Sequence, residues 1–170
     1  MAEVSLEVPG DERGTLLSFV EAQRAALREA ARGLTAEQAS SSPSASALSV
    51  GGLLKHVAEC ELGWLRMAQR RPSERERTRE AYQEGFRLAE GESVASVLEF
   101  WDGVARETEA FIAAVPSLDD TFPLPPAPWF PENGKVSMRW LLLHLVEEFA
   151  RHAGHADIVR ETLDGTRAMG

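Results

Sequence analysis

The segment from Trp140 to Glu161 constrains the fold most, because its residues repeat with the period of a helix. At 100° per residue, one row along that helix holds Leu141, Glu148, His152, His155 and Val159. His144 lies about 40° from Glu148 on the same side. Apolar residues at both ends of the row predict that it faces a core, where an ionised carboxylate needs a partner. A divalent metal would be such a partner, since Glu and His are suitable ligands.

Three other segments show the i, i+3, i+4, i+7 spacing of amphipathic helices. They run from about Asp11 to Leu34, from Val50 to about Gln69, and from Ser93 to about Val115. The expected N-caps are Ser49, Ser93 and Ser137, and Asp164-Gly165 is expected to end the last helix. Strand-like alternation and repeats are both missing from the sequence. We therefore predict an all-α fold: a four-helix bundle, up-and-down with a long crossover connection, forming a single domain over residues 1–170.

The spacing also assigns a buried side to each helix. On the first, it is Leu16, Phe19, Val20, Gln23, Leu27, Ala30 and Leu34, opposite Glu21, Arg24 and Glu29. On the second, it is Val50, Leu53, Val57, Cys60, Trp64 and Met67, with Glu59 and Glu61 expected in solvent. On the third, it is Val97, Phe100, Trp101, Val104, Thr108, Phe111 and Ile112. Gly51 and Gly52 weaken the second helix by about 1 kcal/mol each relative to Ala. Either close approach of another backbone or a frayed start would explain them.

Two connections between the helices are long. Residues 70–92 carry mixed charge and few apolar anchors, which predicts a solvated loop with at most one short helix. Residues 117–136 contain five prolines within the nine positions from Pro123 to Pro131, around Trp129 and Phe130. This segment cannot be helical and is long for a bundle connection. It could form a pocket wall, or Trp129 could pack against the end of the bundle.

Composition excludes several classes of protein. A formal net charge of −9 argues against a nucleic-acid partner, which needs a basic patch. The single cysteine, Cys60, rules out an internal disulfide framework and fits a reducing cytosol. The N-terminal residues lack the features of a secretion signal, and no apolar run reaches the length of a membrane span. We expect a cytoplasmic protein without membrane contact.

The histidines suggest how a metal site could be completed. Glu148 and His152 are four residues apart, so both side chains project from one face of the helix. His56 is the only histidine outside the last helix, and it could reach the pair from the facing helix. Three protein ligands with an open position are typical of a catalytic zinc site. The alternative is that Glu148 pairs with Arg151, or with another arginine, and that the histidines are ordinary polar residues.

Three neighbouring residues have more than one interpretation. Cys60 follows His56 by one turn and is a ligand, a reactive thiol or a small buried hydrophobic residue. His155 and His144 are donors to the ligands, substrate contacts or polar residues of the helix face.

The motif LLKHVAECELGW around His56, together with SMRWLLLHLVEEFARHAGHADIVRETLDG, resembles the DinB-like superfamily of four-helix metal proteins. Within that superfamily the sequence is most similar to the DUF664-type branch, related to mycothiol-dependent maleylpyruvate isomerase. The resemblance covers nearly the whole chain. The usual triad of the superfamily is one His on the second helix and an HxxxH pair on the last. His56 and His152 match that pattern, whereas Glu148 replaces the first His of the pair, as in the His/Glu/His site of the isomerase type.

The resemblance implies an enzyme that depends on a divalent metal, with zinc expected first and nickel as an alternative. His56, Glu148 and His152 would hold the metal. A low-molecular-weight thiol such as mycothiol would serve S-transfer to a small electrophile or its isomerisation. His155 is the candidate catalytic residue, in proton transfer or in support of a ligand. Trp64 and Trp129 are candidate pocket walls that contact the thiol.

Two alternatives to this enzyme stay open. One is a non-catalytic, stress-associated, metal-binding DinB-like protein, with a homodimer formed through exposed helix faces as one expected state. The other is a purely structural bundle in which Glu148 is salt-bridged.

Overall fold

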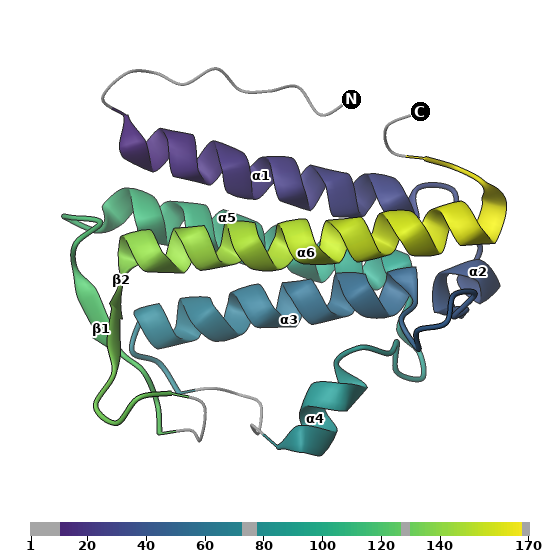
Figure 1. Ribbon diagram of the computed structural model, residues 1–170. Helices are drawn as coiled ribbons and strands as arrows, with labels where there is room; N and C mark the ends of the chain where they lie inside the picture. Colours follow the sequence, from purple (N-terminus) through teal and green to yellow (C-terminus); the bar gives the residue numbers. More distant parts are fainter. Residues whose placement is uncertain (1–10, 73–77, 127–129, 168–170) are drawn as a thin grey trace.

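Four long helices lie side by side along a common direction in the computed structural model (Figure 1). The structure describes residues 11–72, 78–126 and 130–167. The long helices are α1 (Glu12–Ala31), α3 (Val50–Ala68), α5 (Val94–Ala114) and α6 (Met138–Asp164). Two short helices, α2 (Ala36–Ser40) and α4 (Arg79–Glu84), and two short strands, β1 (Thr121–Pro123) and β2 (Lys135–Ser137), lie in the connections. The predicted all-α bundle of the DinB-like kind is confirmed.

Side-chain caps fix where the long helices begin. The side chains of Ser49, Ser93 and Ser137 each accept a hydrogen bond from a backbone N–H in the first turn, as the sequence predicted. At the other end of α6, Gly165 adopts the left-handed conformation (φ 77°) that commonly closes a helix. Helix α1 ends at Ala31, three residues before the expected boundary at Leu34.

Contacts between helix ends give the direction of each helix. The guanidinium of Arg13, at the start of α1, donates to the carbonyls of Ala113 and Val115 at the end of α5, so these helices are antiparallel. Arg66 near the end of α3 pairs with Glu107 in the second half of α5, so those two are parallel. A connection between parallel neighbours must travel the length of the bundle. Residues 69–93, which include α4, are therefore the predicted crossover.

The connection before α6 contains the one clear difference in secondary structure. Strands β1 and β2 pair antiparallel, with Phe122 opposite Val136, although the sequence indicated no strand. Each strand has only three residues, too few for an alternating pattern to stand out. The side chain of Phe122 is buried in the core and anchors this hairpin to the bundle.

The core contains an ion pair where the sequence predicted solvent-exposed side chains. Arg24 of α1 and Glu61 of α3 are both fully buried. Two guanidinium nitrogens of Arg24 donate to the two carboxylate oxygens of Glu61, at 3.2 and 2.5 Å. The indole Nε1 of Trp101 on α5 donates to the same carboxylate at 2.8 Å. The prediction of solvent exposure was wrong because each charge finds its partner on another helix.

The buried stripes are narrower than expected. Phe19 and Phe100 were assigned to the core, but their side chains are 51% and 44% exposed. On α1 the buried residues are Val20, Arg24, Leu27, Ala30 and Ala31, and on α5 they are Val97, Trp101, Val104, Ala105, Thr108 and Ile112. Most steps between them are of three or four residues, as in coiled coils, and both phenylalanines lie at the flank of such a seam.

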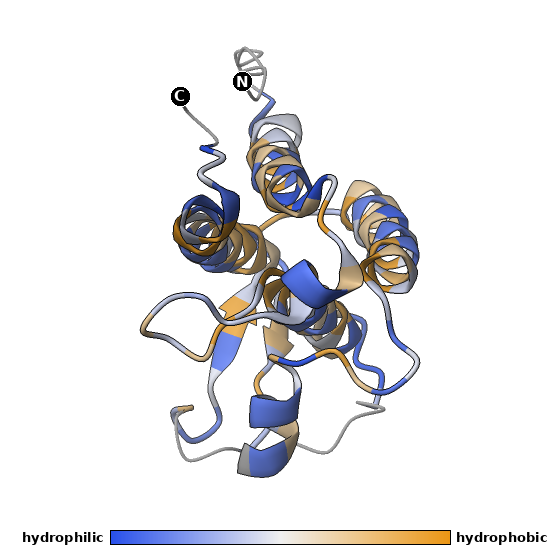
Figure 2. Ribbon diagram, turned by 90° about the vertical axis from the view of Figure 1, so that its right-hand side faces the viewer, coloured by the Kyte–Doolittle hydropathy of each residue, from blue (hydrophilic) through white to orange (hydrophobic). Residues whose placement is uncertain are grey.

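Figure 2 looks along the bundle and shows the long helices end-on, with the short connecting elements beside them. Among the described residues, none of the helices combines the length and the apolar character that crossing a membrane requires.

We predict that Glu61→Ala lowers the free energy of unfolding by about 3–5 kcal/mol, because it leaves the buried guanidinium of Arg24 without its bidentate partner. Urea denaturation would measure the loss. Glu29→Ala, at an exposed position of α1, is the control and should change stability by about 0.5 kcal/mol or less. The double variant Arg24→Met/Glu61→Met should be more stable than Glu61→Ala. Equal stabilities of Glu61→Ala and Glu29→Ala would contradict the importance of the pair.

Candidate metal centre

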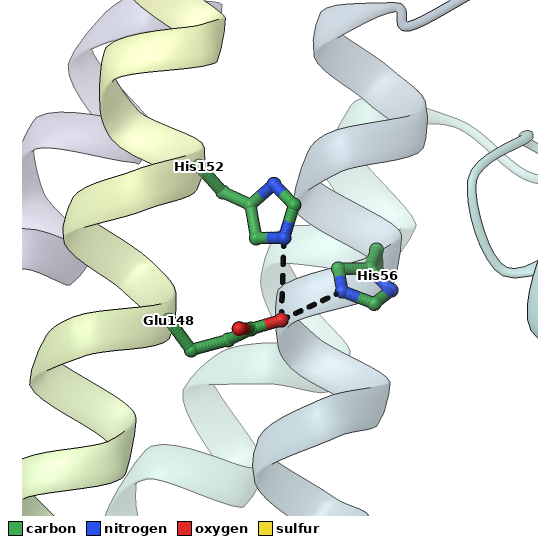
Figure 3. Close-up of side chains that lie close together, drawn as sticks. All are labelled: His56, Glu148 and His152. Carbon is green, nitrogen blue, oxygen red and sulfur yellow. Dashed lines mark hydrogen bonds and ion pairs between the residues drawn. The ribbon is translucent and has the colours of Figure 1, made fainter.

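Helices α3 and α6 bring the three predicted ligands together. Nε2 of His56 donates to Oε1 of Glu148 at 3.1 Å, and Nε2 of His152 donates to the same oxygen at 3.2 Å (Figure 3). The ligand atoms of all three residues lie within 4.8 Å of one another. Glu148 and His152 project from successive turns of α6 towards His56 on α3, so the expected pairing across the bundle is present.

Hydrogen bonds from two histidines hold Glu148 in its ionised form, against the effect of burial. Both imidazoles are buried, and the carboxylate is mostly so. Hydrogen bonds from His152 and from His56 lower the pKa of Glu148 well below its usual range. Its outer oxygen, Oε2, lies 3.5 Å from a guanidinium nitrogen of Arg151, at the limit of a hydrogen bond. The alternative partner considered from the sequence, Arg151, therefore contacts the carboxylate more weakly than the two histidines do.

The donor set fits a divalent transition-metal ion. Ligand atoms that surround one zinc ion at about 2.0–2.2 Å lie roughly 3–4 Å apart. The separations between His56, Glu148 and His152 are compatible with that spacing. Two imidazoles and one carboxylate suit zinc, and nickel as well. A cation held here would replace the two imidazole protons that now point at the carboxylate.

His155 contacts the ring of His152 from one turn further along α6. Its Nδ1 lies 3.3 Å from Nδ1 of His152, so one of these nitrogens donates to the other. Nε2 of His152 faces Glu148, so the contact with His155 is made by the other ring nitrogen and fixes the orientation of the His152 imidazole. His155 is partly exposed, whereas His152 is buried. The arrangement matches the expected location beside the ligands.

Two aromatic residues that the sequence did not indicate cover His56. The ring of Phe86 stacks on His56, with centroids 3.9 Å apart and an interplanar angle of 17°. Tyr82 of α4 meets the same imidazole edge to face at 5.7 Å. Burial, and then the negative charge of Glu148, raises the pKa of the Tyr82 hydroxyl. Both residues lie in the crossover, whose charged composition predicted only a solvated loop.

The glycines at the start of α3 explain how the crossover reaches His56. A Cβ atom on Gly52 would lie 1.9 Å from the carbonyl oxygen of Phe86, and one on Gly51 would lie 2.7 Å from the side chain of Leu88. Close approach of backbone is thus the correct one of the two explanations. Nζ of Lys55 donates to the Glu92 carboxylate at 2.6 Å and ties the same segment to α3. The paired glycines were the signal that could have located this cover.

Cys60, Trp64 and His144 lie beside the centre. Burial, followed by the negative charges of Glu148 and Glu61, raises the pKa of the Cys60 thiol, which disfavours a reactive thiolate. Cys60 packs against the core, as expected of a small hydrophobic residue. Trp64 is buried and contacts His144, whose pKa is lowered by burial. Trp129, the other predicted pocket wall, lies outside the described residues.

Fold and site together define a DinB-like helical bundle with a His/Glu/His cluster. The family described as Mycothiol-S-transferase matches residues 15–165, and the chain therefore belongs to this family. The predicted family relationship is confirmed. Membership indicates a mycothiol-related thiol transferase activity, acting on a small-molecule thiol.

A solved structure shares the fold. It is described as the conserved protein of locus from Enterococcus faecalis and superposes with a TM-score of 0.70 at 16% sequence identity. The match covers 95% of this chain and 100% of that chain. At this identity the likeness supports the fold alone. No curated protein matches the chain significantly.

We predict that Gly52→Ala weakens metal binding by about tenfold or more, because the new methyl group displaces Phe86 from His56. Competition with a chromogenic chelator would measure the affinity for zinc. Gly63→Ala, in the same helix, is the matched control, because a Cβ at that position meets nothing within 4 Å. It should keep the affinity and raise stability by about 0.5–1 kcal/mol. Equal affinities of the two variants would show that the cover over His56 does not support the site.

Proposed function

We propose that this protein is a divalent-metal-dependent enzyme, with zinc as the metal, that joins mycothiol through its sulfur to a small electrophile, whose leaving group departs. The observation that carries the proposal is the meeting of His56, Glu148 and His152 around one point between α3 and α6. The mycothiol-S-transferase family over residues 15–165 supports the choice of thiol. Transfer is favoured over isomerisation because the family is one of transferases.

The ligands have two kinds of role in this proposal. A bound divalent ion would favour the thiolate form of the cofactor at neutral pH, which is the nucleophilic form. Glu148 would supply a negative charge, and each histidine would supply the lone pair of a neutral ring nitrogen, with its proton on the other nitrogen. Three protein groups leave an open position for the thiol.

The surrounding residues would control orientation and water. His155 holds the ring of His152 through the contact between their Nδ1 atoms, and its partial exposure lets it exchange a proton with solvent. Phe86 lies flat on His56 and excludes water from that side of the ligand. Trp64 is proposed as a wall of the thiol site, two turns along α3 from His56. Trp129 stays a predicted wall.

We also propose that the protein works in the cytoplasm, where low-molecular-weight thiols are kept reduced. The single cysteine, Cys60, agrees with a reducing compartment. The homodimer stays a prediction.

We predict about one equivalent of zinc or nickel in the wild-type protein and less than about one tenth of that in His56→Ala and His152→Ala, because two ligands cannot hold the ion. Elemental analysis of protein purified without a metal-affinity tag would measure it. Glu148→Gln should also lose the metal, whereas Glu147→Gln, one residue away and exposed, should retain it. A wild-type protein that takes up neither metal after incubation would contradict the metal centre.

The metal-loaded protein should transfer mycothiol to a chromogenic electrophile such as 1-chloro-2,4-dinitrobenzene. We expect Glu148→Gln to lower kcat/KM at least about 100-fold, since it removes the charged ligand. A chelator should have a comparable effect on the wild type, and Glu147→Gln should have little effect. Stoichiometric metal without thiol-dependent turnover would instead support the non-catalytic metal-binding protein.

A further inference from the structure

An aromatic cluster lies next to the metal centre in the space between α3 and α6. It consists of Trp64, Trp140 and His144, which contact one another in all three pairs. Trp140 stacks on His144, with centroids 4.9 Å apart and an angle of 9°. The ring centroid of Trp64 lies 4.7 Å from that of His144, in an edge-to-face contact. It lies 5.2 Å from that of Trp140, in a tilted contact. The side chain of Trp140 is 38% exposed, so an aromatic surface of the cluster is open to solvent.

The cluster extends from the metal ligands in one direction. His144 precedes Glu148 by one turn of α6, and Trp140 precedes it by two, a distance of about 12 Å along the helix. Trp64 follows His56 by two turns of α3, which runs antiparallel to α6. Both helices therefore place aromatic rings on the same side of the centre, towards the β1–β2 hairpin. Phe86 stacks on His56 from the other direction, beside Gly52 at the start of α3.

A pocket at the β1–β2 hairpin lies next to the aromatic cluster, on the side away from the metal centre. Phe130 lines this pocket and also contacts Trp64, with centroids 6.1 Å apart. The pocket has a volume of about 640 Å³, which is large enough for a small organic ligand. Arg70, Asn133 and Lys135 line it with hydrogen-bonding groups. Apolar rings with a few polar groups are typical of ligand sites.

We propose that the Trp64–Trp140–His144 cluster and the hairpin pocket bind the sugar portion of mycothiol. This inference rests on the proposed function. Mycothiol is a cysteine derivative that carries a sugar and a cyclitol, so its reactive sulfur lies at one end and its hydroxyl-rich rings at the other. The CH-bearing face of a sugar ring packs on aromatic rings, and its hydroxyls need polar partners. With the sulfur at the metal centre, the rings would extend along α6 over Trp140 to the polar groups of the hairpin.

Binding of two thiols tests the inference. The probes are mycothiol and N-acetylcysteine, which has the thiol but no sugar, titrated calorimetrically into zinc-loaded protein. We expect Trp140→Ala to raise the Kd for mycothiol about tenfold and to leave the Kd for N-acetylcysteine within about twofold. Trp140→Phe should retain most of the affinity because it keeps an aromatic face. Phe100→Ala, which removes an exposed ring from α5, is the control and should bind both thiols as the wild type does.

Equal effects of Trp140→Ala on the Kd of both thiols, including no effect on either, would overturn the inference. Elemental analysis of each variant confirms that the metal content is unchanged. The sugar–cyclitol portion without cysteine serves as a third probe, because its binding does not depend on sulfur chemistry. Its binding to wild type and loss in Trp140→Ala would support the inference even if no mycothiol were transferred to an electrophile. Transfer of mycothiol with an unchanged preference for mycothiol in Trp140→Ala would overturn the inference and leave the proposed function intact.

Discussion

The ion pair between Arg24 and Glu61 determines how α3 is rotated within the bundle. Glu61 binds Arg24 on α1 and Trp101 on α5, so its side of α3 is fixed towards those two helices. His56 precedes Glu61 by five residues and therefore points about 140° away around the helix. That direction is occupied by α6, where Glu148 lies. A buried pair adds little net stability when it replaces apolar packing. The contribution of the Arg24–Glu61 pair here is to orient the helix that carries His56.

The carboxylates of Glu61 and Glu148 differ in their partners, and this difference determines which of them can bind a cation. Glu61 is matched by a guanidinium, which stays charged at every relevant pH. Glu148 is matched by two imidazoles and has only a distant contact with Arg151. Imidazoles can lose a proton and offer a lone pair, whereas a guanidinium cannot. Only the second arrangement leaves a negative charge and two neutral donors available to a cation.

Sequence periodicity predicted the helices and placed Glu148 and His152 on one face, because both depend on short-range spacing. His56 is 92 residues from Glu148, and it was selected as the only histidine outside the last helix and by the family resemblance. The caps Ser49 and Ser93 and the four-residue step from Glu148 to His152 are local signals, and the structure agrees with them. The pairing of Arg24 with Glu61 was missed because its partners are 37 residues apart and look like ordinary surface charges. Phe86 was missed for a related reason. Its contact with His56 depends on the path of the crossover, which only the ambiguous glycines of α3 suggested.

The topology places the two long connections around the cluster of His56, Glu148 and His152. Because α3 and α5 are parallel, the crossover must return along the bundle, and it carries Phe86 and Tyr82 over one side of His56. The hairpin before α6 brings Phe130 against Trp64 on the other side. The ligands themselves are on long helices, whose packing resists change. Connections tolerate substitution and insertion far better than helices do. A bundle of this kind can therefore change the molecule it binds through its two long connections, while the helices keep His56, Glu148 and His152 in place.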